Sequence, residues 1–264
     1  MKIATYNINS IRARALNLWQ WLKKADPDIV FLQEIKCESE NFPYFECETS
    51  GYKVAVLGQK GYNGVAILSK YDFEITAKNL PNFNDDSAMR YLEILVKKGT
   101  QRFFAASVYA PNGCSPDKEI EKEKLKYKLK WFDCLREHLL ERQTTGLPIV
   151  LGGDFNVMMT PLDVYNPKQF ENTPLYMKAV WDKMYALSYS GMHDAFRLLY
   201  PKNEGFTFWD YTGNSFVTNS GLRIDYIFVT AQFAERLTRC SADKSLRMMD
   251  KPSDHTALVA EFEV

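Results

Sequence analysis

Short apolar segments that lead into carboxylate and amide residues constrain the fold of this chain more than any other feature. The clearest is the apolar run Pro148–Leu151, which is followed directly by Gly-Gly-Asp-Phe-Asn at Gly152–Asn156. The glycine pair predicts a tight turn after a buried strand, and such a turn would present Asp154 and Asn156 to a substrate instead of packing them into a core.

The N-terminal region repeats this pattern. Lys2–Ile8 alternates loosely like a strand and carries Asn7, and the apolar strand predicted at Asp28–Leu32 is followed by Glu34. Further short strands are predicted at Val54–Leu57, Val65–Leu68, Phe73–Ala77, Tyr91–Val96, Arg102–Tyr109, Phe206–Trp209, Arg223–Val229, Leu246–Met249 and Thr256–Phe262. The strands between residues 54 and 109 predict a mostly antiparallel meander.

Four helices are predicted between these strands. Ala13–Lys24 should be helical with Leu16, Trp19 and Leu22 on one face, and Lys118–Arg142 is the clearest amphipathic helix. Thr173-Pro174 predicts a cap that opens a helix closed at Ser190-Gly191, and a short helix is expected at Asp194–Tyr200.

The two halves share an order of strands, a long helix and a strand that ends in polar residues. This order predicts an α+β fold in which two sheets pack face to face with helices outside, so that the polar strand ends converge on one rim. The 264 residues show no Pro-, Gly- or Ser-rich linker, which favours one domain over residues 1–264.

Charge and cysteine content limit the functional classes. The 33 basic and 33 acidic residues balance, so any nucleic-acid binding must come from a local patch. The five cysteines form no C-x-x-C pair, which supports neither a disulfide framework nor a zinc ribbon. No apolar run approaches the ~18 residues that span a membrane, and the first residues predict a strand and not a signal peptide. We expect a monomeric cytoplasmic protein.

The polar rim has the groups that phosphodiester hydrolysis needs. Glu34 is the leading ligand for a hard cation such as Mg²⁺, with Asn7 and Asp254 completing or adjoining its coordination shell. Of three histidines, His138 and His193 are expected to be structural or exposed, whereas His255 follows Asp254 directly before the last strand. If Asp225 accepts a hydrogen bond from one ring N–H of His255, the imidazolium form of His255 is favoured.

Each carboxylate alone is more typical of a surface ion pair or a turn, but the set predicts metal-dependent phosphodiester cleavage. The order of motifs resembles the bacterial exodeoxyribonuclease III family of apurinic/apyrimidinic endonucleases over essentially the whole chain. The matching segments run from Ala4 to Arg12, Leu32 to Lys36, Asn63 to Ser69, Tyr109 to Gly113, Gly153 to Asn156, Phe206 to Tyr211, Gly221 to Asp225 and Pro252 to His255.

The resemblance implies a DNase I-like, four-layer αββα sandwich. It also implies Mg²⁺-dependent incision of duplex DNA on the 5′ side of an abasic site, with 3′–5′ exonuclease or 3′-end repair activity and with Mn²⁺ as a substitute metal. Asp154 would activate or position the attacking water, and Tyr109 and Asn156 would contact the scissile phosphate. Asp225 would orient His255, and Asp254 would lie at the metal or at a second metal position.

The same resemblance makes Phe208, Leu222 and Ile224 a small apolar pocket for a base-free sugar, although such residues are usually simple core. A pocket too small for a base would select abasic sites, where flipping costs least. We also assign Asn112, Arg90 and Trp209 to substrate binding. This chain departs from the family at Tyr6, Thr212 and Phe216, and Thr212 replaces an arginine that could contact phosphate.

The substrate itself stays open at this stage, because a similar metal rim serves sphingomyelin phosphodiesterases, inositol polyphosphate phosphatases and non-specific DNases. RNA, lipid or inositol phosphates are therefore the alternative substrates. A non-enzymatic binding module would have lost a metal or acid/base residue, and none is missing here.

Overall fold

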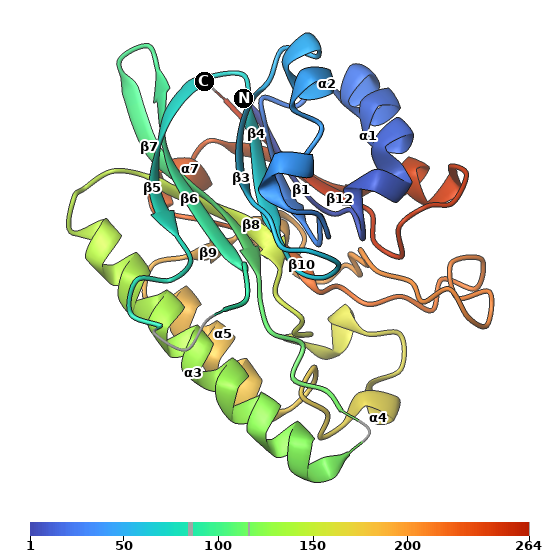
Figure 1. The fold of residues 1–264 in the computed structure, drawn as a ribbon. Helices are drawn as coiled ribbons and strands as arrows, with labels where there is room; N and C mark the ends of the chain where they lie inside the picture. The colour runs from blue at the N-terminus through green and yellow to red at the C-terminus, as the bar shows by residue number, and fades with distance from the viewer. Residues whose placement is uncertain (84–86, 116, 264) are drawn as a thin grey trace.

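The computed structural model describes residues 1–83, 87–115 and 117–263, and its strands form two six-stranded sheets (Figure 1). The first sheet has the order β11 (Leu237–Asp243), β12 (Ala257–Phe262), β1 (Lys2–Asn7), β2 (Ile29–Gln33), β4 (Val65–Ser69) and β3 (Lys53–Leu57). The second has the order β5 (Asp72–Lys78), β6 (Tyr91–Lys98), β7 (Gln101–Tyr109), β8 (Ile149–Asp154), β10 (Asp225–Val229) and β9 (His193–Asp194). Both are mixed sheets, because β1–β2 and β7–β8 are parallel pairs.

Helices cover the outer face of each sheet. Figure 1 shows α1 (Ile11–Ala25) and α2 (Tyr44–Thr49) outside the first sheet, and α3 (Lys118–Gln143) and α5 (Lys178–Tyr189) outside the second. The shorter helices are α4 (Pro167–Phe170), α6 (Ala195–Leu199), α7 (Ala231–Ala234) and three 3-10 turns at Ser39–Asn41, Pro161–Asp163 and Lys244–Met248. This arrangement confirms the predicted four-layer αββα sandwich. Among the described residues, no helix is both long and apolar enough to cross a bilayer.

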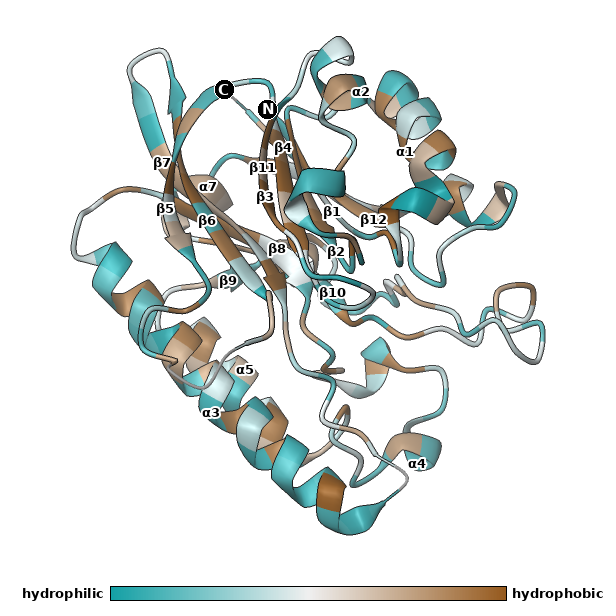
Figure 2. Cartoon of the chain, viewed as in Figure 1, coloured by the Kyte–Doolittle hydropathy of each residue, from teal (hydrophilic) through white to brown (hydrophobic). Residues whose placement is uncertain are grey.

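Apolar side chains fill the spaces between the four layers, and Figure 2 shows the hydrophobic strands at the centre of the molecule. Phe31 and Ile67 of the first sheet meet Val150 and Ile227 of the second in the central core. The outer face of the second sheet packs against α3 and α5, and that of the first packs against α1. The central strands of both sheets thus contribute side chains to the shared core and to an outer core.

The long helix α3 agrees closely with its prediction. Asp117 caps it by accepting hydrogen bonds from the backbone N–H groups of Glu119 and Ile120. The predicted apolar face is buried at Phe132, Leu135 and Leu139.

The buried face of α1 differs from the prediction. Leu16 is 75% exposed, whereas Leu18, Trp21 and Leu22 pack against the first sheet. Trp21 is the fully buried tryptophan of this helix, whereas Trp19 is only partly buried, and the Trp21 indole N–H donates to Asp243 Oδ2 at 2.9 Å. Tertiary packing of the tryptophan therefore decides which of two adjacent apolar stripes faces inward.

Several other predicted elements differ from the structure. Phe206–Trp209 forms only isolated bridges, in which Phe208 pairs with Leu222 and His255. The predicted strand Leu246–Met249 is instead the end of the 3-10 turn Lys244–Met248 and the residue after it. The edge strand β11, which precedes this turn, was not predicted. α5 begins at Lys178, because Thr173 and Tyr176 pair in a turn upstream of it. The meander is divided between the sheets, since β4 and β5 belong to different ones.

A buried ionic network joins α3 to the second sheet. The Glu93 carboxylate lies 2.9 Å from His138 Nε2 and 2.9 Å from Arg142 Nε, and it accepts hydrogen bonds from the Tyr91 and Thr76 hydroxyls. Burial raises the pKa of Glu93, but His138, Thr76 and Arg142 together lower it by more than burial raises it. The pKa of Glu93 is therefore below its ordinary value. His138 is therefore structural, as predicted.

We expect Glu93→Gln to reduce the free energy of unfolding at pH 7 by about 3–5 kcal/mol, because the Arg142 guanidinium loses its buried counter-charge. A depressed carboxylate pKa stabilises the fold above the unfolded-state pKa, and this stabilisation is lost as the pH falls through the folded-state pKa. Urea unfolding between pH 3 and 7 should therefore show a flatter pH dependence for Glu93→Gln than for the wild type. Parallel curves would contradict the assignment.

Candidate active site

The predicted rim forms where the strand ends of the two sheets meet. Asn7 ends β1 and Glu34 directly follows β2 in the first sheet, whereas Tyr109 and Asp154 end the parallel strands β7 and β8 in the second. Asp225 begins β10 opposite Asp154, and His255 lies two residues before β12. The structure thus brings these six sequence-predicted residues to one place.

The glycine pair before Asp154 has a different role from the predicted turn. Gly152 and Gly153 lie within β8, and neither has a positive φ. A Cβ atom at Gly152 would lie 2.5 Å from the Phe31 ring, and one at Gly153 would lie 1.8 Å from the Val108 carbonyl oxygen. Glycine is required here because the backbone of β8 closely approaches its neighbours on both sheets.

One amide links the two acidic groups of the rim. Asn7 Nδ2 donates to Glu34 Oε1 and to Asp154 Oδ2, both at 2.9 Å. Glu34 Oε2 also lies 2.8 Å from Lys36 Nζ. Glu34 and Lys36 have φ values of 49° and 52°, an unfavourable backbone conformation for side chains of this kind. Such strain is commonly stored at functional sites.

The donor set at this point suits a hard divalent cation. Potential ligand atoms of Glu34, Asp154 and His255 lie within 4.8 Å of one another, and the Asn7 amide contacts both carboxylates. Burial raises the pKa of Glu34, but Lys36 and Asn7 lower it by more than burial raises it. The carboxylate is therefore ionised and able to bind a cation. Carboxylate and amide oxygens are preferred by Mg²⁺, and in this conformation Asn7 turns its N–H groups, not its oxygen, toward the two carboxylates.

His255 is better suited to proton transfer than to metal binding. Its Nδ1 lies 2.9 Å from Asp225 Oδ2, the pairing that the sequence predicted, and its Nε2 lies 3.7 Å from Asp154 Oδ2. Burial lowers the pKa of His255, but the Asp225, Asp154 and Asp254 carboxylates outweigh burial and raise the pKa to about 10. An imidazolium has no free lone pair for a metal.

Asp154 has the opposite environment from an ordinary surface carboxylate. Its pKa is raised to about 7, first by burial and also by the nearby Asp225 and Glu34 carboxylates, although His255 and Asn7 oppose the shift. A carboxylate and an imidazolium with displaced pKa values, facing each other in a buried site, form a typical acid/base pair.

Asp254, the third predicted metal residue, is hydrogen-bonded at the edge of this cluster. Its Oδ1 accepts from Asn9 Nδ2 at 2.9 Å, and Asn9 Oδ1 accepts from Lys36 Nζ at 2.7 Å. Asp254 is therefore linked to Glu34 through Asn9 and Lys36.

Tyr109 is oriented by Arg90. The Arg90 guanidinium lies 5.0 Å from the centre of the Tyr109 ring, and its Nη1 lies 3.4 Å from the Tyr109 carbonyl oxygen. Burial and the Glu34 and Asp154 carboxylates hold the pKa of Tyr109 well above its usual value. The phenol is consequently neutral and can donate a hydrogen bond.

Two asparagines form a hydrogen-bonded pair beside Asp154. Asn156, with φ 52°, donates its backbone N–H to Asp154 Oδ1 at 2.9 Å and its side-chain N–H to the Ala110 carbonyl at 2.9 Å. The exposed Asn112 donates Nδ2 to Asn156 Oδ1 at 3.1 Å. The amide of Asn112 is thereby held at the solvent-facing edge of the site.

The predicted apolar pocket is present only in part. Phe208, whose ring lies 5.0 Å from the His255 ring, and Leu222 line a hollow of about 410 Å³ whose other walls include Gln169 and Asp210. Ile224 does not line this hollow but is buried in the small core beneath it.

The assignment of Trp209 to substrate binding is wrong. It is 0% exposed, and its ring packs edge-on against Phe216 at 5.2 Å and beneath Lys244 Nζ at 5.1 Å. A wholly enclosed ring cannot contact a substrate in this structure, so Trp209 supports the loop from inside.

Four polar residues of the site were not assigned from the sequence. Lys36 and Asn9 link the acidic groups as described above. The buried Thr207 hydroxyl donates to Asp225 Oδ2 at 2.6 Å, and the Ser253 hydroxyl donates to the Asn7 carbonyl at 2.8 Å. The available signal was position: Thr207 separates two phenylalanines, and Lys36 and Asn9 each stand two residues after an assigned residue.

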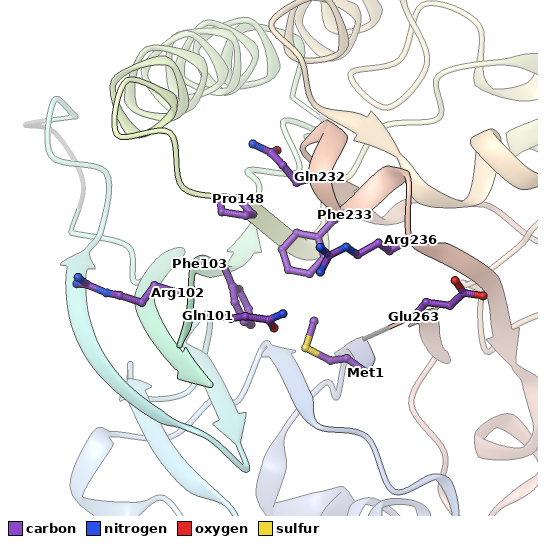
Figure 3. Close-up of a pocket in the computed structure, with 9 residues that line it drawn as sticks. All are labelled: Met1, Gln101, Arg102, Phe103, Pro148, Gln232, Phe233, Arg236 and Glu263. Carbon is purple, nitrogen blue, oxygen red and sulfur yellow. The ribbon is translucent and has the colours of Figure 1, made fainter. Parts of the chain in front are cut away.

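A second hollow, of about 230 Å³, lies at the opposite end of the sandwich near the two termini (Figure 3). Phe103 and Pro148 line it near the starts of β7 and β8, whose other ends carry Tyr109 and Asp154. Arg102 and Arg236 stand on its wall. None of the predicted site residues is among its lining residues, so it is separate from the rim.

Comparisons with known proteins agree with this geometry. The model of the Endonuclease/Exonuclease/phosphatase family matches residues 4–255. The chain is 33% identical to Exodeoxyribonuclease III of Haemophilus influenzae over 273 aligned residues, with 100% of both proteins covered. An AP endonuclease structure from Archaeoglobus fulgidus superimposes with a TM-score of 0.91 at 34% sequence identity. The structure of the 3′ phosphatase NExo from Neisseria, bound to a product DNA hairpin, superimposes with a TM-score of 0.91 at 32% sequence identity. Both superpositions cover 100% of both chains. The predicted DNase I-like fold is thus confirmed.

Proposed function

The chain belongs to the endonuclease/exonuclease/phosphatase family, and from that premise we propose that it is a DNA repair nuclease that hydrolyses the phosphodiester on the 5′ side of an abasic site. The observation that carries this proposal is the arrangement around Asp154. Asn7 joins its carboxylate to Glu34, and His255, paired with Asp225, faces it from the other side. The names of the similar proteins support DNA as the substrate and 3′–5′ exonuclease and 3′-end repair as additional activities.

We propose that Glu34 holds the divalent metal and that Asn7 joins it by rotating its amide to present Oδ1, with Mg²⁺ as the physiological ion and Mn²⁺ as a substitute. When bound, such an ion neutralises charge that develops on the phosphoryl oxygens. Asp254 would act at a distance, through Asn9 and Lys36, on the orientation of Glu34.

The remaining residues divide the chemistry among themselves. Asp154, with a pKa near neutrality, accepts the proton of the attacking water, since an ionised buried carboxylate is a strong local base. The His255 imidazolium and the Tyr109 phenol donate to the phosphoryl oxygens, where negative charge grows in the transition state. Asn156 and Asn112 supply further donors at the edge of the site.

The function is tested with the purified protein and three duplexes: one with a single abasic site, one undamaged, and one with a 3′-phosphate. Wild-type protein with Mg²⁺ should incise the abasic duplex 5′ to the lesion and should lose this activity in EDTA. If none of the three duplexes is cleaved while an RNA, lipid or inositol phosphate assayed in parallel is hydrolysed, the DNA repair assignment is wrong.

We expect Glu34→Gln to raise the half-saturating Mg²⁺ concentration by at least about 10–100-fold, since even groups that only orient a metal ligand change affinity by that factor. Titration of cleavage with Mg²⁺ measures the shift directly. Glu261→Gln, at a β12 residue of the same sheet outside the rim, is the control. An unchanged Mg²⁺ dependence in Glu34→Gln would exclude it as a ligand.

The hollow beside His255 supports a site for the base-free sugar. We expect Leu222→Ala to widen it and to reduce the preference for abasic over undamaged duplex by about 10-fold, the scale of discrimination that a small apolar change provides. The measurement is the ratio of kcat/KM on the two duplexes. Ile224→Val, which trims a residue beneath the hollow, should leave that ratio unchanged; an equal effect of both variants would assign Leu222 to the core.

A further inference from the structure

Lys128 is a buried charged residue outside the chemistry described above. It lies on α3 and is 0% exposed, and burial lowers the pKa of its ammonium to about 7. A lysine is almost never fully buried unless its polar end is compensated.

Its partners are three backbone carbonyls from three different segments. Lys128 Nζ donates to the carbonyl oxygens of Asn112 at 3.0 Å, Asn156 at 2.7 Å and Pro174 at 2.7 Å. Three acceptors match the three N–H donors of an ammonium group, whereas a neutral amine would leave one acceptor without a donor. The Lys128 side chain thus joins the segment after β7, the segment after β8 and the turn before α5 through its Nζ atom.

Two of the three carbonyls belong to residues at the active site. Asn156 gives its backbone N–H to Asp154, and Asn112 gives its side-chain N–H to Asn156. Gly113, next to Asn112, has φ 85°, and a Cβ atom there would lie 2.9 Å from Pro174 and 3.1 Å from the Lys128 side chain. The segments are therefore packed closely around the lysine, with no space for a different side chain at that glycine.

We propose that Lys128 is a positioning residue that fixes Asn112 and Asn156 relative to Asp154 by holding their carbonyls from behind. It touches neither substrate nor metal. This inference rests on the proposed function, because its effect on turnover requires that the two asparagines contact the scissile phosphate.

The test compares Lys128→Met and Lys128→Gln with the matched control Lys126→Gln, an exposed lysine on the same helix paired with Glu123. On abasic duplex, we expect Lys128→Met to lower kcat by about 10-fold with KM little changed, because the misplaced donors act in the transition state. Lys128→Gln, which retains two donors, should lie between Lys128→Met and wild type, and it is the deciding variant if Lys128→Met does not fold. An unchanged kcat in a folded Lys128 variant would overturn the proposal.

A double-mutant comparison separates positioning from general loosening of the fold. In an Asn112→Ala background, Lys128→Met should cost only about threefold in kcat, because one of the residues through which the lysine acts is gone. A full 10-fold loss in both backgrounds would mean that the lysine does not act through Asn112, contrary to the proposal.

A readout without turnover distinguishes this inference from the proposed function. The side-chain amide NMR signals of Asn112 and Asn156, assigned by their loss in single Ala variants, should shift in Lys128→Gln and stay in place in Lys126→Gln. Shifted signals in a protein that cleaves no DNA would support positioning and refute the nuclease assignment. Unshifted signals would overturn the positioning role whatever the activity.

Discussion

Asp154→Asn should lower kcat on abasic duplex by at least about 10²-fold while DNA binding persists, because an amide cannot accept the proton of the attacking water. The substitution is nearly isosteric, and it removes a buried carboxylate whose pKa is already raised to about 7. Because both Asp154 oxygens accept N–H donors, the amide leaves one of these donors without an acceptor, which offsets the gain from removing the buried charge. Single-turnover cleavage in saturating Mg²⁺ gives the rate, and duplex binding in Ca²⁺ gives the affinity.

The control for this variant is Asp182→Asn, an exposed carboxylate on α5 that pairs with Lys178. It should cleave at the wild-type rate. A higher KM with unchanged kcat in Asp154→Asn would assign Asp154 to substrate binding and leave the base unidentified.

His255→Ala is expected to have an effect of similar size, a loss of at least about 10²-fold in kcat, because the acid that protonates or stabilises the phosphoryl transition state is removed. Asp225 is expected to act through this imidazole. The double variant Asp225→Asn/His255→Ala should therefore be no slower than His255→Ala alone, since residues that act as a unit are strongly non-additive.

His193→Ala, at a half-buried histidine on β9, is the matched control and should retain wild-type activity. If the Asp225 and His255 losses multiplied in the double variant, the two residues would have independent roles. The 2.9 Å contact between them would then serve only the fold.

The parts of the site that were predictable from sequence are those encoded by local pattern. Apolar strands followed by polar residues placed Asn7, Glu34 and Asp154 on one rim without any knowledge of the topology. The Asp225–His255 pair was also predicted, because His255 directly precedes an apolar strand and has no competing role as a core residue. Strand periodicity carries this information from the sequence alone.

What was missed depends on contacts between distant segments. The need for glycine at Gly152 and Gly153 comes from the Phe31 ring and the Val108 carbonyl, which no local pattern reveals. The edge strand β11 was missed because, of its residues, only Cys240 is fully buried, so it has no alternation to detect. Trp209 was misassigned because an aromatic residue beside a catalytic motif looks the same whether it faces solvent or the interior.

The two sheets contribute different halves of the active site, which has a consequence for how the protein can evolve. Asn7 and Glu34 belong to the first sheet and Asp154 and Asp225 to the second, and the gap between them is set where Phe31 packs against Gly152. A substitution that alters the volume of the central core would move one pair of residues relative to the other. Core and catalytic positions should therefore show epistasis, so that a core change tolerated in one homologue inactivates another with a different interior.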